Sequence, residues 1–239
     1  MGHSENLKPP QPGISDHVYQ LAHLTAGVLP VFGSTIQTIL EIFGPPIDRR
    51  KEVWCEQMAD AVRRLQSEYS VSVDALASDP TFVDIVVRIT DAAIRTSEQK
   101  KHQALQNALI NAGASIGVDQ EQRIMFIRFV AELQDVHIGV LELFRDPIEW
   151  FRRHGKQWPS RTAGGHEDTL RRAFPELAER EYFVRQVWRD LRTRGLVELD
   201  DLGGTVSGAA LGRCQLSSFG VQFLKFISEP MPDRQQETR

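Results

Sequence analysis

Residues 46–69, PIDRRKEVWCEQMADAVRRLQSEY, set the architecture because their apolar side chains recur at helical intervals. The apolar positions follow one another at spacings of seven, four, three, four and four residues: Ile47, Trp54, Met58, Ala61, Leu65 and Tyr69. Arginines and acidic residues fill most of the other positions, so one face is apolar and the rest is charged. The pattern predicts an amphipathic helix that buries one side against neighbouring helices.

Glycine, proline and capping residues mark helix boundaries on both sides of this segment. Gly44 is expected to end a short helix that begins at Ser34, and the prolines at 45 and 46 are expected to start the next one. Downstream, Asp79 is a predicted cap, and Pro80 should begin another helix. Its predicted buried face consists of Phe82, Ile85, Val86, Ile89 and Ala93.

A further long amphipathic pattern runs from residue 120 to residue 144. Asp119 and Gln122 resemble a capping box, which predicts the start of one long helix. Its apolar positions are Ile124, Ile127, Val130, Leu133, Val140, Leu141 and Phe144. Asp146 and Pro147 should begin a last short helix that stops near Gly155. Because no strand-like alternation persists in residues 14–155 and the connections are short, we expect an antiparallel helical bundle.

The last third of the chain has a different order of elements. Helical patterns over 167–174 and 180–195 are followed by LVEL at 196–199, the glycine-rich GGTVSGAALG at 203–212, CQLSS at 214–218 and an amphipathic helix. The phrases LRTRGLVEL at 191–199 and QLSSFGVQFLKFI at 215–227 resemble the recognition-helix exit and the closing helix of winged-helix domains. The resemblance implies a small helical unit with a short β-hairpin, which serves protein contacts in some proteins and DNA binding in others.

The sequence therefore predicts a mainly α-helical protein with two folded parts. The expected organisation is a disordered tail (1–13), a helical bundle (14–157), a linker (158–165), a winged-helix-like domain (166–228) and a second disordered tail (229–239). The two cysteines, Cys55 and Cys214, do not form the framework of a disulfide-rich secreted protein. The first dozen residues lack the features of a signal peptide, so we expect a cytoplasmic protein that contacts a membrane peripherally on activation.

Charge is distributed unevenly between the two parts. Residues 1–150 carry 13 Lys and Arg against 20 Asp and Glu, whereas residues 151–239 carry 15 against 12. Only the second part is therefore suited to meeting a polyanion. Its predicted contact residues for DNA or a protein partner are Arg185, Arg189 and Arg192, on the outward face of one helix. Acidic residues in and beside the same helix, and a glycine-rich stretch without Lys or Arg, argue against DNA.

An uncharged segment of seventeen residues, LTAGVLPVFGSTIQTIL at 24–40, is the second candidate site. Glycine and proline make it a poor membrane span, so packing inside the bundle is the simpler interpretation. The alternative is a segment that is released after a trigger and inserts into a bilayer. The residues assigned to this membrane-active or interaction role are Leu29, Val31, Phe32, Ile36, Ile39 and Leu40.

The order of these features resembles a family of bacterial proteins. An apolar N-terminus rich in small residues, a helical body containing FVAELQDVHIGVLELF at 129–144 and a closing winged-helix-like unit are similar in layout to helical abortive-infection proteins of the Abi-alpha type. This resemblance implies a role in antiviral defence against phage, through injury to the host membrane. It transfers no functional residue.

Catalytic and metal-binding patterns were not found in the sequence. No second His, Cys or carboxylate lies three or four residues from His137 on its apolar face, so we interpret it as a hydrogen-bonded residue at the edge of the core. The glycines at 203–212 lack nucleotide-binding spacing, and Asp200 and Asp201 belong to a solvated turn. We therefore expect no cofactor and no metal, and an enzyme with an unrecognised site is the least favoured interpretation.

Two functional interpretations stay open. The preferred one is a non-enzymatic helical protein that acts through protein or membrane contacts, with abortive infection as its most specific form and a protein partner or homo-oligomer as its assembly. The alternative is a transcription regulator that reads DNA through the winged helix. Neither the trigger nor a small-molecule ligand can be identified from these residues.

Overall fold

The computed structural model describes residues 33–115, 118–159 and 163–230, with side chains from residue 47 onward. These residues are mainly helical and contain a small two-stranded antiparallel sheet. The chain divides into two compact units, residues 1–52 and residues 53–239. The tail expected at 1–13, and all but the first two residues of the tail expected at 229–239, lie outside the described residues.

Helix α2 (Gly33–Tyr69) is continuous where a break was predicted. It runs through Gly44 and the prolines at 45 and 46, so the prediction that Gly44 ends a short helix is wrong. Proline removes a hydrogen bond from the helix but keeps φ near the helical value, so it does not by itself end one. Trp54, Ala61 and Leu65 are buried as predicted, whereas Ile47 is 40% exposed.

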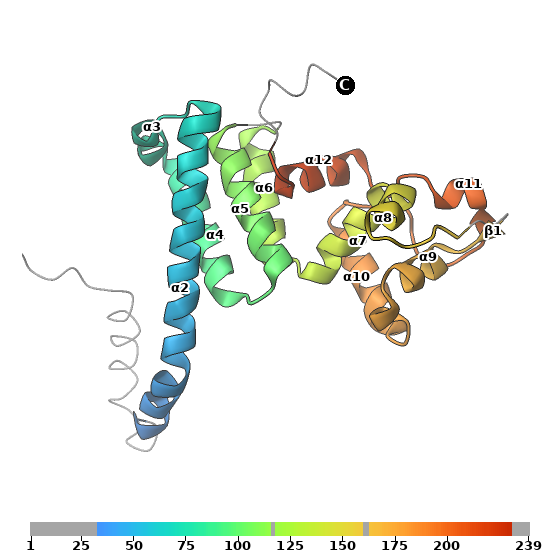
Figure 1. Cartoon of the computed structure of the whole chain (residues 1–239), viewed down its shortest axis with the longest axis horizontal. Helices are drawn as coiled ribbons and strands as arrows, with labels where there is room; N and C mark the ends of the chain where they lie inside the picture. The colour runs from blue at the N-terminus through green and yellow to red at the C-terminus, as the bar shows by residue number, and fades with distance from the viewer. Residues whose placement is uncertain (1–32, 116–117, 160–162, 231–239) are drawn as a thin grey trace, which may run out of the picture. The chain divides into compact units, whose positions relative to one another are not determined.

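Three shorter helices follow α2: α3 (Val73–Ser78), α4 (Pro80–Arg95) and α5 (Gln99–Gly113). The predicted start of α4 is confirmed, since the Asp79 carboxylate accepts a hydrogen bond from the Thr81 N–H at 2.9 Å. Its predicted apolar face is buried at Phe82, Ile85, Ile89 and Ala93. Helix α4 packs against both α5 and α6, and these helices form the bundle seen in Figure 1.

The single long helix predicted over residues 120–144 is wrong. Asp119 caps a first helix as predicted, with its carboxylate 2.8 Å from the Gln122 N–H, but α6 (Gln120–Glu132) stops there and α7 (Asp135–Arg145) begins anew. Leu133 and Gln134 between them have extended backbones. Ile124, which was predicted to face the core, is 43% exposed.

A contact with α5 explains this break. The Asp135 carboxylate accepts hydrogen bonds from the backbone N–H groups of Lys100 at 3.3 Å and Lys101 at 2.7 Å, in the first turn of α5. In return, the Glu98 carboxylate accepts one from the Asp135 N–H at 3.3 Å. The first turn of a helix has N–H groups without intrahelical partners, so each helix start satisfies donors of the other. A continuous helix would leave Asp135 unable to make this exchange.

The remaining elements are α8 (Pro147–Arg153), β1 (Ala163–Gly164), α9 (His166–Ala173), the 3-10 helix η1 (Pro175–Leu177), α10 (Glu181–Thr193), β2 (Val206–Ser207), α11 (Gly208–Leu211) and α12 (Ser218–Ile227). The short helix predicted to start at Asp146 and Pro147 is confirmed as α8. The segments expected to form a hairpin, 196–199 and 214–218, meet at an antiparallel bridge between Val197 and Leu216.

The glycine-rich stretch at 203–212 is more structured than a simple turn. It contains β2 and α11, and β2 pairs antiparallel with β1, which lies in the segment expected to be a linker. Ala163 lies opposite Ser207 and Gly164 opposite Val206. This long-range pairing was not predicted, because two residues are too few to show a strand pattern in the sequence.

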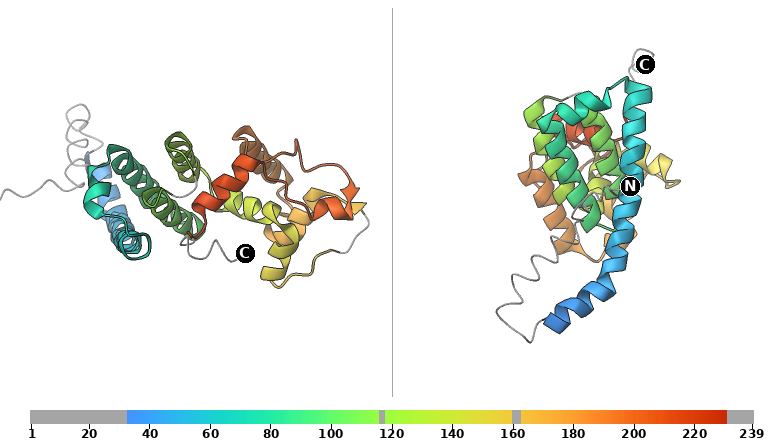
Figure 2. Two further views of the ribbon diagram at one scale, coloured as in Figure 1. Left: turned by 90° about the horizontal axis from the view of Figure 1, so that it is seen from above. Right: turned by 90° about the vertical axis from the view of Figure 1, so that its left-hand side faces the viewer.

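Helix α12 joins the C-terminal elements to the bundle. It packs against α5, α6 and α7, although it lies about a hundred residues further along the chain (Figures 1 and 2). The ring of Phe126 on α6 lies 4.9 Å from that of Phe219, 5.3 Å from that of Phe223 and 5.6 Å from that of Phe226. The hydrophobic core therefore continues from Trp54 to Ile227, and the predicted linker at 158–165 does not divide it.

Two buried asparagines on α5 hold the end of α12. The Asn111 side chain donates hydrogen bonds to the carbonyls of Phe226 at 2.7 Å and Ser228 at 3.1 Å, and Asn107 donates to that of Ile227 at 3.0 Å. These carbonyls lie at the end of a helix, where no further N–H of the helix can reach them. The asparagines thus satisfy polar groups that burial would otherwise leave without partners.

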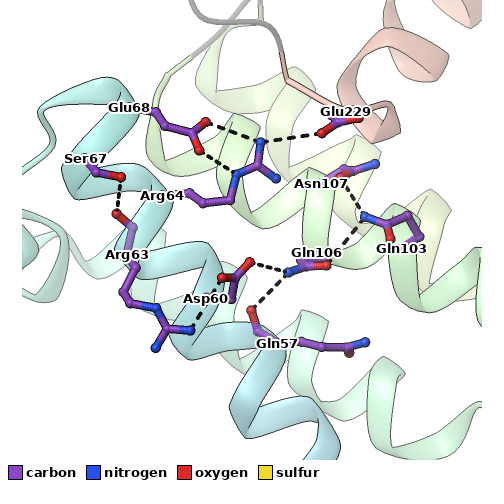
Figure 3. Close-up of polar contacts among 10 residues, drawn as sticks. All are labelled: Gln57, Asp60, Arg63, Arg64, Ser67, Glu68, Gln103, Gln106, Asn107 and Glu229. Atoms are coloured by element: carbon purple, nitrogen blue, oxygen red, sulfur yellow. Dashed lines mark hydrogen bonds and ion pairs between the residues drawn. The ribbon is translucent and has the colours of Figure 1, made fainter.

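A polar seam on the other side of α5 connects it to α2 (Figure 3). Gln106 donates hydrogen bonds to the Gln57 carbonyl at 3.2 Å and to the Asp60 carboxylate at 3.4 Å. Arg64 of α2 pairs with Glu68 at 3.1 Å and reaches Glu229, just after α12, at 3.8 Å. Helix α5 therefore forms hydrogen bonds both to α2 and to the end of α12.

Replacing Gly220 by alanine should destabilise the protein strongly. A Cβ at Gly220 would lie 1.9 Å from the Leu196 carbonyl oxygen, so the backbones must separate. We expect the free energy of unfolding to fall by about 3 kcal/mol, as for an overpacked core, in a urea titration. Gly139→Ala on α7 is the control, because its Cβ would lie 3.4 Å from the Phe174 ring, in ordinary contact. Equal stability of the two variants would contradict this account.

Replacing Asn111 by alanine should also lower stability. The variant leaves the carbonyls of Phe226 and Ser228 without their side-chain donor, and we expect a loss of about 2 kcal/mol in the free energy of unfolding. Gln99→Ala, at an exposed position of the same helix, should change it by less than about 0.5 kcal/mol. If Asn111→Ala unfolds at the wild-type urea concentration, these hydrogen bonds do not hold α12.

Candidate functional site

Helix α10 carries the three arginines predicted to contact DNA or a partner. Its buried side consists of Val184, Val187, Trp188 and Leu191. The arginines at 185, 189 and 192 follow at spacings of four and three residues, which places them on one exposed face. The structure thus brings the predicted contact residues together.

These arginines line a cleft of about 510 Å³. We call it the α10 cleft, and its lining residues are Glu167, Val184, Arg185, Trp188, Arg189, Arg192, Thr193, Asp200, Asp201, Leu202 and Gly203. One wall is α10 and the other is the loop 200–203, with Glu167 from the start of α9. Trp188 and Leu202 are buried and form its apolar base.

Hydrogen bonds fix the loop wall relative to α10. The Trp188 indole N–H donates to the Leu199 carbonyl at 3.2 Å, just before the loop. The Leu202 carbonyl accepts from the Glu167 N–H at 3.3 Å, and the Asp201 carboxylate accepts from the Gly203 N–H at 2.7 Å. Backbone groups and the buried Trp188 side chain take part in these bonds, so the fold itself sets the shape of the cleft.

Most of the arginines of the cleft are paired with acidic residues. Arg185 lies 2.5 Å from Glu181, one turn earlier on α10, and Arg192 forms an ion pair with Asp200 across the cleft. Among the residues that the structure describes, Arg189 has no ion pair and donates a hydrogen bond to the Gln186 side chain at 3.2 Å. The side chains of these two pairs are between 44% and 82% exposed, so each pair contributes little to stability and can exchange partners.

The charges of the cleft lining balance. The three arginines face three carboxylates, those of Glu167, Asp200 and Asp201. The sequence suggested only that Asp200 and Asp201 lie in a solvated turn, and no local signal places them opposite α10. A surface of mixed sign differs from the basic stripe that binds nucleic acid through its phosphates. It is suited to a partner that itself carries both charges.

The other side of α10 is tied to the bundle by a polar cluster. The His137 side chain of α7 is buried, with Nε2 3.6 Å from an Asp190 carboxylate oxygen, and it accepts a hydrogen bond from the Gln134 N–H at 3.3 Å. The Arg194 guanidinium pairs with Glu132 at 2.9 Å. His137 was predicted to be a hydrogen-bonded residue at the core edge, and its environment agrees with that prediction.

Two further buried polar residues were not singled out by the sequence. The Lys101 ammonium donates to the Ala131 carbonyl at 2.7 Å, near the end of α6, and burial lowers its pKa. His166 is 3% exposed and lies edge-on to Phe144, and burial lowers its pKa as well. Both positions stand among polar residues in the sequence, so periodicity alone does not indicate that they are buried.

The structure does not test the predicted membrane-active segment. Leu29, Val31 and Phe32 lie outside the described residues. Ile36, Ile39 and Leu40 lie in α2, but only their backbone is described. Within the described part of the chain, no helix has the length and apolar character needed to cross a membrane.

Side chains that could bind a metal ion are dispersed over the described residues. In the ranges 33–115, 118–159 and 163–230, no three His, Cys, Asp or Glu side chains come together in a group that could hold a metal ion. Cys55 and Cys214 are both exposed and unpaired as thiols. The α10 cleft is thus the surface on which the predicted contact residues converge.

Comparison with known proteins adds no further guide to function. No protein-family model, curated protein or solved structure matches this chain. The geometry of the α10 cleft and the chemistry of its residues therefore carry the functional argument.

The stability of the protein should decrease as the pH falls below neutrality. Burial lowers the pKa of His137, although Asp190 opposes the shift, and burial likewise lowers the pKa of His166. The unfolded chain binds protons at these histidines from about pH 6.5 downward, whereas the folded chain binds them only at lower pH. The free energy of unfolding should therefore fall from pH 7 towards pH 5, and less steeply in His137→Gln.

Urea titrations at each pH test this expectation. Arg194 and Lys101 also face His137 and disfavour its charged form, so they act in the same direction as burial. Comparison of the variant with the wild-type protein at about pH 8, where both histidines are neutral in either state, isolates the packing effect. An unchanged slope in the double variant His137→Gln/His166→Gln would show that other groups cause the pH dependence.

Proposed function

We propose that this chain is a non-enzymatic helical protein that acts through protein contacts, and that the α10 cleft is the contact surface. The observation that carries the proposal is the pairing of the α10 arginines with acidic residues in and beside the cleft. A polyanion would have to displace Glu181 and Asp200 and would meet the carboxylates of Glu167 and Asp201 at close range. A protein surface with both signs of charge can replace these pairs one for one.

The residues of the cleft are also those that favour protein contacts. Arginine, tyrosine and tryptophan are enriched where interfaces gain most of their binding energy. Tyr182, one turn before Arg185 and two turns before Arg189 on α10, is 91% exposed, and Trp188 forms part of the base of the cleft. An exposed aromatic ring beside exposed arginines supports binding of a partner protein.

Defence against phage by abortive infection is the most specific form of this proposal. It rests on the layout that resembles Abi-alpha-type proteins and on the uncharged segment 24–40. In this form the α10 cleft receives a partner or second copy, and the apolar segment contacts the host membrane once released. The C-terminal elements α9 to α12 then act as a winged-helix-like unit for assembly.

Phage challenge of bacteria that express the protein tests this function. The wild-type chain should reduce plaque formation, and Arg185→Ala/Arg189→Ala should lose most of the protection because the cleft no longer binds its partner. Arg95→Ala is a matched control, since Arg95 is 77% exposed and pairs with Asp91 one turn away on α4, as Arg185 pairs with Glu181 on α10. Full protection by the cleft variant, with expression at wild-type level, would refute the proposed role of the cleft.

The membrane contact has a separate test. Replacing Leu29, Val31 and Phe32 by aspartate should abolish dye release from liposomes of anionic lipid if these residues insert. A wild-type protein that leaves such liposomes intact, while it still protects against phage, would restrict the function to protein contacts.

DNA binding by the same helix is the second candidate, and one observation favours it. Arg189 has no ion pair among the described residues, so it is available for a phosphate. Fluorescence anisotropy with a DNA duplex at about 50 mM salt would then show binding that falls steeply as salt is added. We expect no such binding, and retention that disappears in Arg185→Ala/Arg189→Ala would instead establish a transcription regulator.

A further inference from the structure

The positive and negative charges of the α10 cleft are separated by element. The helix contributes an arginine wall, which consists of Arg185, Arg189 and Arg192. The loop and the start of α9 contribute an acidic wall, which consists of Glu167, Asp200 and Asp201. Glu167 is itself paired with Arg171 of α9 at 2.7 Å, so Asp200 and Asp201 supply most of the negative charge that faces the arginine wall.

A surface of this kind is complementary to itself. In a twofold dimer both subunits use the same surface patch. If the twofold axis passes between the two walls, each wall of one copy meets the opposite wall of its partner. A rotation of this type brings the arginine wall of each copy opposite the acidic wall of the other. Both contacts are then attractive, whereas most unrelated surfaces match one wall and repel the other.

We propose that two copies of this chain dimerise through the α10 cleft, with the arginine wall of each copy facing the acidic wall of the other. This inference rests on the proposed function and names the partner that the cleft receives. The loop 200–203 offers the acidic side chain for this contact, since the Asp200 side chain is 82% exposed. The cleft beside Arg189 is the recess that receives it.

The ion pairs within each chain do not oppose this exchange. Arg192 is 50% exposed where it pairs with Asp200, and Arg185 is 60% exposed where it pairs with Glu181. Exposed pairs of this kind contribute little, so replacing an internal acidic partner by one from the second copy costs little free energy. Arg189 gains a carboxylate that it lacks among the described residues.

Tyr182 adds an apolar component to the same surface. It lies on the same helix, one turn before Arg185 and two turns before Arg189, and exposes 91% of its surface. Burial of an aromatic side chain stabilises an interface, whereas exposed ion pairs in water contribute little. The dimer thus combines a charge pattern that sets its orientation with an aromatic side chain that stabilises it.

Charge reversal of one wall at a time provides a sharp test. Arg185→Glu/Arg189→Glu makes both walls acidic, and Asp200→Arg/Asp201→Arg makes both walls basic. In sedimentation velocity the wild-type chain should be a dimer that dissociates as salt is raised, and each variant alone should be a monomer. An equimolar mixture of the two variants should form a heterodimer, because each acidic wall then meets a basic one.

Additional variants separate dimerisation from local damage. The single change Asp200→Arg retains the hydrogen bond from the Gly203 N–H to Asp201 and should still weaken the dimer by about tenfold or more. Tyr182→Ala should weaken it as well, whereas Arg95→Ala on α4 should leave it unchanged. Circular dichroism of each variant verifies that the helices are retained.

Several outcomes would overturn the dimer. A monomeric wild-type chain at about 100 μM, or a mixture of the two variants that stays monomeric while both are folded, excludes pairing through these walls. Increased DNA binding by Asp200→Arg/Asp201→Arg without heterodimer formation points to nucleic acid instead. If the wild-type chain is monomeric but Arg185→Ala/Arg189→Ala loses phage protection, the proposed function holds with another partner and the dimer is refuted.

Discussion

The hydrogen bonds from Asn107 and Asn111 to the end of α12 are the contact on which the arrangement of residues 53–230 depends. They satisfy the carbonyls of the buried residues Phe226 and Ile227 and of the half-buried Ser228. With these groups satisfied, the phenylalanines of α12 can pack against Phe126 at no polar cost. The last helix of the chain thereby becomes part of the bundle, and the two share one core.

The other end of α12 positions the candidate site. Ser217 accepts a hydrogen bond from the Gly220 N–H at 2.9 Å, and its hydroxyl donates to the Gly195 carbonyl at the exit of α10. Gly220 lacks a side chain and so allows the Leu196 backbone to approach closely. The exit of α10 is thus held against the start of α12, and the arginine wall takes its orientation from the bundle. Polar contacts of Asp190 and Arg194 with α7 and α6 reinforce that placement.

Helical periodicity predicted much of the fold. The apolar faces of α4 and α10, the caps at Asp79 and Asp119, and the start of α8 follow from local rules, because each depends on residues within one or two helical turns. The same rule placed Arg185, Arg189 and Arg192 on one face of α10 before any tertiary contact was known. For these features the local signal and the packed structure agree.

Long-range contacts account for what the amino-acid order did not show. The break at Leu133 and Gln134 follows from the exchange of capping groups between Asp135 and Glu98, which lie 37 residues apart. The pairing of β1 with β2, the burial of Lys101 and His166, and the acidic wall opposite α10 arise in the same way. In each case the partner is remote in sequence, and a hydrogen bond, a charge or a buried surface forms only when packing brings the two segments together. Local pattern thus specified helices and their faces, whereas packing decided which faces meet and which charges line the cleft.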